Sequence, residues 1–381
     1  MKNILFLADP NSIHDVKWIS YFHEAGYARC FVLPRDHHFA TYQKSGAAKG
    51  CTFEMLNPIH DFSVRRFLRT LKEAIRIKAI IAQKRIDLIH ILYAEPNALW
   101  CLFRDYFNVP MIISARGSDV LRTIPQAFHR HDPLNKLVSS MYRRAFRKAD
   151  WITGTSQAQF DSISKFSTRS HGMSIVRTGI DRKKMEGDTS GYFPLSTSRS
   201  FILFPRYMRP VYNHTLELAA IAMLPPSIKQ SHVMVFLGRN GGDEEYEREI
   251  LHLMEAQPEV TFEFLERQSQ ESLFELYKRA SVVVMTPLSD GSPVSGMEAL
   301  LCGSKLILGP LHYDSDIFSQ AIRMQTWDAA ELAALITRTL DDPHRPQLSA
   351  KEIAAMDREA NMTRMQEIYQ SLVGSSGSIE V

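Results

Sequence analysis

The sequence predicts an α/β protein with two domains, each built on a parallel sheet, and three observations carry this prediction. Short apolar runs recur along the chain, and most are followed by a helical pattern, as in βαβ units. The first run, residues 3–9, is typical of a parallel strand that is buried on both faces. A second series starts at residue 201, after a polar stretch at 186–200 that is rich in Ser, Thr and Gly.

The 381 residues are sufficient for two separate hydrophobic cores. We expect a first domain at 1–185, a linker at 186–200 and a second domain at 201–355. Residues 356–381 would add a C-terminal helix that packs back on the first domain, followed by a disordered tail. Both domains are expected to be Rossmann-like.

The composition narrows the class of protein. A net charge of +3 gives no case for general nucleic-acid binding. The four cysteines lie far apart, without a CxxC pair or a histidine at metal-ligand spacing, so we expect reduced core residues in a cytoplasmic protein. No stretch approaches the roughly 18 apolar residues of a membrane helix, and the first apolar run is too short for a signal peptide.

The first strand, 3–9, leads through a loop into a helix whose apolar residues recur at helical spacing up to Gly26. The second strand follows at 31–34. No GxGxxG motif follows the first strand, which argues against an NAD or FAD site there.

Residues 62–85 form a basic amphipathic helical segment with eight Lys or Arg against one acid, Glu73. Such a segment can lie on an anionic membrane, where each cation contributes on the order of 1 kcal/mol. It can equally be the solvated face of a domain helix, and the sequence leaves both interpretations open.

The most informative stretch is 280–310, which is predicted to be a buried strand, a loop, a short helix from about Val294 to Cys302 and a second buried strand. Such a βαβ unit directs a helix N-terminus to the carboxyl edge of the sheet, where it attracts an anion, commonly a phosphate. Asp290 and Glu298 frame the loop with seven residues between them. The alternative is an ordinary strand-to-helix turn.

This stretch resembles the E-x7-E signature of the family 4 glycosyltransferases, with Asp290 in place of the usual first Glu and Glu298 as the second. Further segments resemble other parts of the family pattern. Residues 116–119 resemble its "HGsD" loop with Arg116 in place of His, and Arg206 follows the strand 201–205 as the family's Arg does. The resemblance covers roughly residues 1 to 340. It implies the GT-B fold, in which two Rossmann-like domains face a central cleft, and retaining transfer without a metal.

The resemblance also implies roles for individual residues. Arg206 would contact the diphosphate, Asp290 a hydroxyl of the donor sugar and Glu298 the ribose. The usual Lys after the Arg is missing, so either Arg209 or the pair Tyr212 and Asn213 replaces it. The remaining donor-binding residues would be Gly238, in a turn resembling "GxGp", and the loop residues Ser292, Pro293, Val294 and Ser295.

On the acceptor side, the resemblance implies His14, with Ser12 and Asp119 nearby. The planar guanidinium of Arg116 suits a phosphate or carboxylate, so it would hold the diphosphate or an acidic group of the acceptor. Alternatively, Arg116 forms a structural salt bridge with Asp119, and His14 is a solvated residue at a helix start.

The sequence therefore predicts a metal-independent, retaining glycosyltransferase that moves a sugar from a UDP- or GDP-sugar to a hydroxyl acceptor. No cofactor is expected. The acceptor would be a carbohydrate or a lipid-linked molecule in bacterial cell-surface polysaccharide or glycolipid assembly, at the inner face of the membrane. The alternatives are a nucleotide-sugar epimerase on the same fold and a non-catalytic nucleotide-sugar-binding protein.

Overall fold

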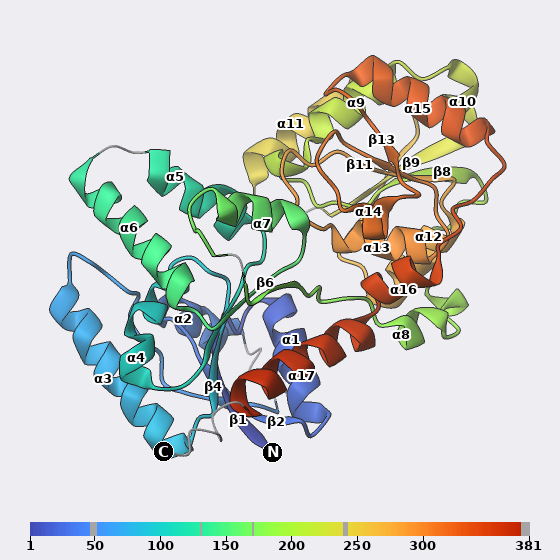
Figure 1. Cartoon of the computed structure of the whole chain (residues 1–381). Helices are drawn as coiled ribbons and strands as arrows, with labels where there is room; N and C mark the ends of the chain where they lie inside the picture. The colour runs from blue at the N-terminus through green and yellow to red at the C-terminus, as the bar shows by residue number, and fades with distance from the viewer. Residues whose placement is uncertain (46–51, 130–131, 170, 239–242, 375–381) are drawn as a thin grey trace. The chain divides into compact units, whose positions relative to one another are not determined.

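The computed structural model describes residues 1–45, 52–129, 132–169, 171–238 and 243–374. The chain forms two compact units, Met1–Thr178 with Asn361–Val381, and Gly179–Ala360 (Figure 1). Three of the sequence predictions concern residues outside the described ranges. They are the reduced core cysteine at Cys51, most of the turn after Gly238 and the disordered tail. Among the described helices, none is long and apolar enough to cross a membrane.

Unit 1 contains a parallel sheet of seven strands in the order β3-β2-β1-β4-β5-β6-β7. The strands are short and mostly buried, as expected for a sheet that is covered on both faces. Their bounds are β1 Lys2–Leu7, β2 Ala28–Leu33, β3 Glu54–Met55, β4 Leu88–Leu92, β5 Met111–Ser114, β6 Trp151–Gly154 and β7 Met173–Ile175.

Helices cover both faces of this sheet because successive strand residues point to opposite sides. Leu5 and Leu7 belong to the core under one set of helices, whereas Ile4 and Phe6 belong to the core under another. The first set is α3 Phe67–Lys84, η1 Asn97–Phe103, α4 Arg104–Phe107, α5 Ile124–His129, α6 Pro133–Lys148 and α7 Gln157–Ser164. The second set contains α1 Ile13–Glu24 and the last helix, α17 Arg358–Gly374. The remaining helices of unit 1 are α2 Asp36–Ser45 and η2 Asp119–Thr123.

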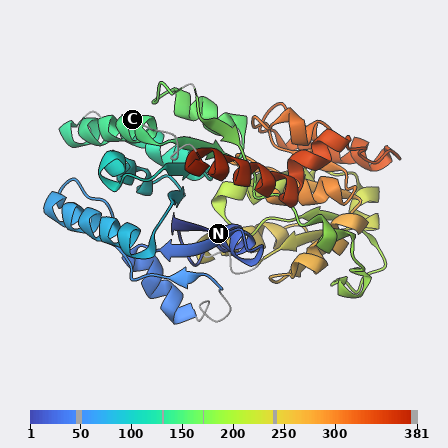
Figure 2. The same cartoon turned by 60° about the horizontal axis from the view of Figure 1, so that its bottom comes forward.

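The last helix completes the core of unit 1 beside α1 (dark red in Figures 1 and 2). Tyr369 is fully buried, and its ring packs against Phe22 with 5.2 Å between the centroids. Its hydroxyl lies 2.6 Å from Nδ1 of His90, whose Nε2 lies 2.6 Å from Oγ of Ser114. Residues from both ends of the chain therefore form one hydrophobic core.

Unit 2 repeats the arrangement with six parallel strands in the order β10-β9-β8-β11-β12-β13. The strands are β8 Ser200–Phe204, β9 His232–Leu237, β10 Phe262–Leu265, β11 Val282–Met285, β12 Leu306–Leu308 and β13 Ile322–Arg323. Both sheets thus have the doubly wound order: strands are first added on one side of the unit's first strand and then on its other side. The predicted α/β class with two parallel sheets is confirmed.

Two helical layers cover the sheet of unit 2 as well (Figure 1). One contains α9 His214–Ala222, α11 Glu244–Glu255 and α15 Ala329–Asp341. The other contains α12 Gln270–Arg279, α13 Val294–Leu301, α14 Ser315–Phe318 and α16 Ala350–Met356. Shorter elements are α8 Arg182–Glu186, η3 Ser190–Tyr192, η4 Pro210–Tyr212 and α10 Pro226–Ser231.

Candidate functional site

The candidate site lies where the strand order of unit 2 reverses, between β8 and β11. Arg206 follows β8 and Asp290 follows β11, and their side chains form an ion pair with 3.1 Å between Nη2 and Oδ2. In doubly wound sheets the carboxyl ends of the strands at such a reversal form the usual ligand crevice. Two residues that are 84 positions apart in the sequence therefore meet where the fold favours a ligand.

The guanidinium of Arg206 is held by three neighbours. In addition to Asp290, Nη1 lies 3.4 Å from Oγ of Ser295, and the guanidinium stacks on the ring of Tyr212 with 4.1 Å to its centroid. Only 16% of the Arg206 side chain is exposed. A cation fixed in this way offers a planar fork of N–H donors, which matches the oxygens of a phosphate.

Burial raises the pKa of the Asp290 carboxyl, and the Arg206 guanidinium and two backbone N–H groups of the loop act against this rise. The sequence predicted a contact between Asp290 and a donor sugar. In the structure, the carboxylate accepts one hydrogen bond from Nη2 of Arg206, so it orients the cation.

Helix α13 directs its N-terminus to the same place. Pro293 occupies the N-cap position, and no side chain caps the helix. Its first N–H groups thus form a positive end that can bind an anion. Gly296 allows this close packing, because a Cβ there would lie 2.9 Å from Cε of Met285 and 3.0 Å from Phe318. The hydroxyl of Ser292, in the loop before the helix, is buried and has no hydrogen-bond partner among the described residues.

Glu298 lies one turn further along α13 and is only 6% exposed. Its Oε1 accepts a hydrogen bond of 3.2 Å from Nε2 of Gln270, at the start of α12. The two acids that frame the predicted signature thus belong to one unit and one strand-loop-helix segment.

A buried network that the sequence analysis missed supports the loop after β8. The Nδ1 of His214 lies 2.7 Å from a carboxylate oxygen of Glu217, and its Nε2 lies 3.0 Å from the carbonyl oxygen of Tyr207. Both partners only accept hydrogen bonds, so both ring nitrogens donate and His214 is an imidazolium. Burial opposes this charge, but the Glu217 carboxylate and the hydrogen bond to Tyr207 together outweigh burial and raise the pKa of His214. The sequence signal is a His and a Glu three residues apart, which the structure places on the first turn of α9.

Tyr313, in the turn after β12, was also missed. It is 5% exposed, and its hydroxyl is buried without a hydrogen-bond partner in the part of the chain that the structure describes. Burial raises the pKa of Tyr313, and the charges of Asp290 and Arg206 act on it as well. A buried hydroxyl within electrostatic reach of the ion pair is a group that a ligand could satisfy.

The remaining residues predicted to bind the donor are Gly238, Arg209 and Tyr212, and their environments differ. Gly238 has a φ of 80°, and a Cβ there would lie 1.9 Å from Cδ1 of Tyr207, so the aromatic ring requires a glycine. Arg209 is exposed, whereas Tyr212 contacts Arg206 directly.

Arg116 and Asp119 belong to unit 1. Asp119 is fully buried and accepts backbone N–H groups from Ala94, Arg116, Gly117 and Val120, so it fixes the loop after β5. The Arg116 guanidinium lies over Trp18, 4.6 Å from the ring centroid, and its Nη1 lies 3.3 Å from Oγ1 of Thr178. Within the described ranges, its Nε and Nη2 are buried without a hydrogen-bond partner.

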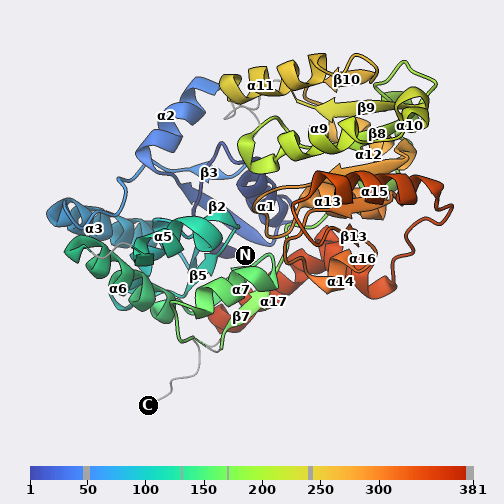
Figure 3. The same cartoon turned by 90° about the horizontal axis from the view of Figure 1, so that it is seen from above.

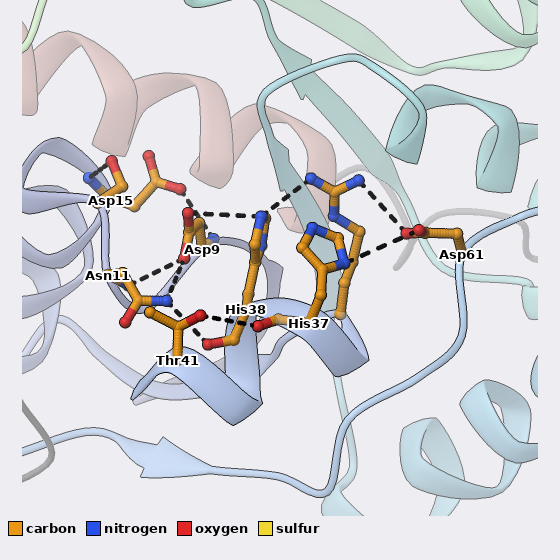
Figure 4. A network of polar contacts seen from close by, with 9 residues as sticks. Asp9, Asn11, Asp15, His37, His38, Thr41 and Asp61 are labelled. Carbon is orange, nitrogen blue, oxygen red and sulfur yellow. Dashed lines mark hydrogen bonds and ion pairs between the residues drawn. The ribbon is translucent and has the colours of Figure 1, made fainter. Parts of the chain in front are cut away.

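Polar side chains also gather where β1 and β2 of unit 1 end (Figure 4). The Nε2 of His38 lies 3.5 Å from Asp9, and Arg35 contacts both His38, at 3.1 Å, and Asp61, at 3.3 Å. Burial and the Arg35 charge lower the pKa of His38 to about 4, so this ring is neutral at physiological pH. Of the predicted acceptor residues, Ser12 caps α1 through the N–H of Asp15, and His14 is exposed on that helix.

Within the residues that the structure describes, no group of three or more His, Cys, Asp or Glu side chains could hold a metal ion.

Two family models match the chain, one in each half. Residues 3–156 match the model described as glycosyl transferase 4-like, and residues 193–355 match the model of glycosyl transferases group 1. No curated protein sequence matches significantly.

Solved structures resemble the chain over nearly its whole length. A glycosyltransferase from Rickettsia africae is 12% identical with a TM-score of 0.72, covering 98% of each chain. Sucrose-phosphate synthase from Thermosynechococcus elongatus is 16% identical with a TM-score of 0.70, covering 98% of this chain and 100% of the other. Anabaena HepE, solved with UDP and glucose, is 14% identical with a TM-score of 0.63, covering 100% of both chains. These similarities establish the fold.

Proposed function

The chain is a glycosyltransferase of group 1 with the GT-B fold, and from this premise we propose that it transfers a sugar from a nucleoside diphosphate sugar to a hydroxyl acceptor, with retention of configuration. The observation that carries the proposal is the ion pair of Arg206 and Asp290 beside the uncapped N-terminus of α13. The donors there suit a diphosphate, because both the guanidinium fork and the helix end favour an anion.

Sugar transfer requires stabilisation of the charge that develops in the transition state, and Arg206 and the N-terminus of α13 would provide it. The bond between the sugar C1 and the diphosphate oxygen breaks towards an oxocarbenium-like centre, while the leaving diphosphate gains negative charge. Arg206 and the α13 N-terminus stabilise that charge. The acceptor oxygen bonds to C1 on the same face, and its proton goes to the departing phosphate, so no carboxylate nucleophile of the protein is required.

The other predicted residues complete the proposed site. Asp290 orients Arg206 and contacts a hydroxyl of the donor sugar, and Glu298 holds the ribose. The Tyr212 ring stacks on the Arg206 guanidinium, with 4.1 Å between Cζ and the ring centroid, and so holds it in place. Ser292, Pro293, Val294 and Ser295 line the phosphates, and Gly238 leaves room for Tyr207.

For the acceptor, we propose unit 1, with His14, Ser12, Asp119 and Arg116 on or near its binding surface. Asp119 acts by shaping the loop, since it is fully buried, and Arg116 offers a cation to an acidic group of the acceptor. A carbohydrate or lipid-linked acceptor in cell-surface polysaccharide or glycolipid assembly would agree with contact between 62–85 and an anionic membrane.

The test begins with thermal shifts of the full chain in UDP-, GDP- and ADP-sugars, and then measures release of nucleoside diphosphate with and without candidate hydroxyl acceptors. Release that depends on the acceptor is the expected result. Turnover of the donor without any acceptor would indicate an epimerase, and binding without turnover across the acceptor panel would favour a non-catalytic protein. Either outcome would contradict the proposal.

We expect Tyr313→Phe to weaken donor binding about tenfold and to leave the free protein as stable as before, or slightly more stable. The hydroxyl is buried and unsatisfied, so its removal costs the free protein nothing. In the complex it would hydrogen-bond the donor. Titration of donor and the melting temperature without ligand measure the two effects.

A second tyrosine provides the control for that experiment. Tyr369→Phe removes a buried hydroxyl that already has a partner, since it lies 2.6 Å from His90 of unit 1. This variant should lose stability by about 1 to 2 kcal/mol and bind donor normally. Unchanged donor affinity in Tyr313→Phe would remove Tyr313 from the site.

A further inference from the structure

Three helices of unit 1, α3, α4 and α6, pack on the same face of its sheet (Figure 1), and Figure 3 shows α3 and α6 on that side of the unit from above. Lys78 of α3 donates a hydrogen bond of 2.8 Å to the carbonyl oxygen of Phe107 at the end of α4. Lys148 of α6 forms an ion pair with Asp105 of α4. These contacts join the helices into one surface, which we call the α3/α6 face.

Large apolar side chains protrude from this face. Leu68 is 79% exposed and Ile75 is 61% exposed, and they lie seven residues apart on the same side of α3. Phe67, Tyr106 and Leu137 are also exposed, at 52%, 47% and 49%. Apolar residues of this size usually lie inside a protein, and their gathering on three neighbouring helices indicates an interaction surface.

Most charged side chains on the face are positive, although Lys148 is paired with the exposed Asp105 of α4 and Lys84 with Glu54. Helix α6 carries five Lys or Arg and no acid, and α3 carries five against one acid, Glu73. That acid is buried and bonded to Arg76. The two helices thus hold nine excess positive charges, five from α6 and four from α3, although the whole chain has a net charge of only +3. The positive charge is therefore concentrated on this face and offset elsewhere.

We propose that the α3/α6 face docks on an anionic lipid membrane. Cations attract the anionic headgroups, and the exposed Leu68 and Ile75 enter the boundary between headgroups and acyl chains. A nucleic acid would also attract the cations, but the exposed aliphatic side chains would gain nothing from it. The cations reach well beyond the segment 62–85, because four exposed ones, Lys136, Arg143, Arg144 and Arg147, belong to α6.

The test is co-sedimentation of the full chain with vesicles of phosphatidylcholine, alone or with about 30% phosphatidylglycerol, at low and high salt. Binding should require phosphatidylglycerol and weaken at high salt. Replacing Lys72, Lys136, Arg144 and Arg147, which are exposed on α3 and α6, with Gln should lower the partition coefficient on the order of 100-fold. Leu68→Ser with Ile75→Ser should lower it about tenfold.

A matched control removes the same number of charges elsewhere. Lys183, Arg248, Lys351 and Arg364 are exposed on other helices, and their replacement with Gln changes the net charge equally. This variant should bind vesicles as the wild type does. Equal loss in the control, or binding to pure phosphatidylcholine, would overturn the proposal. Normal vesicle binding by the double serine variant would indicate a general polyanion site instead. None of these residues is in the donor site, so the outcome is independent of sugar transfer.

Discussion

Arg206→Ala is expected to lower kcat/KM about 100-fold, which corresponds to about 2.7 kcal/mol of transition-state stabilisation. The guanidinium is fixed between Asp290, Ser295 and the Tyr212 ring, so it needs no rearrangement when charge develops on the leaving group. Its removal also leaves the Asp290 carboxylate buried without its cation. Steady-state kinetics with the donor identified by thermal shift provide the measurement.

Two further substitutions separate charge from geometry. Arg206→Lys keeps the charge but loses the donor fork and the flat surface that stacks on Tyr212, so it should recover only part of the activity. Arg248→Ala removes an exposed cation from α11 in the same unit and should leave kcat/KM unchanged. If Arg206→Ala retained full activity, the diphosphate would have to bind elsewhere.

Glu217→Ala is expected to destabilise the protein by about 3 to 5 kcal/mol, because it leaves a buried imidazolium without its counter-charge. His214 is fully buried and Glu217 is 1% exposed. The loss also removes the hydrogen-bond acceptor of the Thr286 hydroxyl, whose Oγ1 lies 3.1 Å from the carboxylate. Denaturant unfolding measures this effect, and Glu186→Ala, in an exposed pair with Arg182, should cost less than about 1 kcal/mol.

The same pair predicts a pH dependence. Burial disfavours the charged His214, but Glu217 and the Tyr207 carbonyl together outweigh burial, so the folded-state pKa lies above the ordinary value of about 6.5. The stability from this pair is therefore fully present below pH about 6.5 and is lost as the pH rises through the folded-state pKa. The stability difference between the wild type and Glu217→Gln should shrink over that rise. A difference that grew with pH would exclude the imidazolium.

The parts of the site that the sequence predicted are those that follow directly from strand ends. Buried parallel strands appear as short apolar runs, so the ends of β8 and β11 could be located within a residue or two. Residues that follow parallel strands meet at one edge of the sheet, and Arg206 and Asp290 lie near each other for this reason. Their direct ion pair was not expected, because it depends on side-chain conformations.

Other parts of the candidate site could not be predicted from the local sequence. Tyr313 lies in a turn after β12, and its proximity to Asp290 depends on the neighbouring strand in the sheet. The Tyr212 ring could be placed near Arg206, but its stacking under the guanidinium could not. In unit 1, Asp119 has a motif position that suggests ligand binding, yet its carboxylate is occupied by four backbone N–H groups.

Unit 1 is formed by two separate segments of the chain, and this affects the order in which the two units can fold during translation. Residues 179–360 form a continuous unit, which can close its core as soon as the ribosome has released it. Unit 1 must wait, because Trp18, Phe22 and His90 remain without their covering helix until Tyr369 has been translated. Although its first strand emerges first, the N-terminal half matures last, and a nascent chain stopped before α17 would present that apolar surface to chaperones.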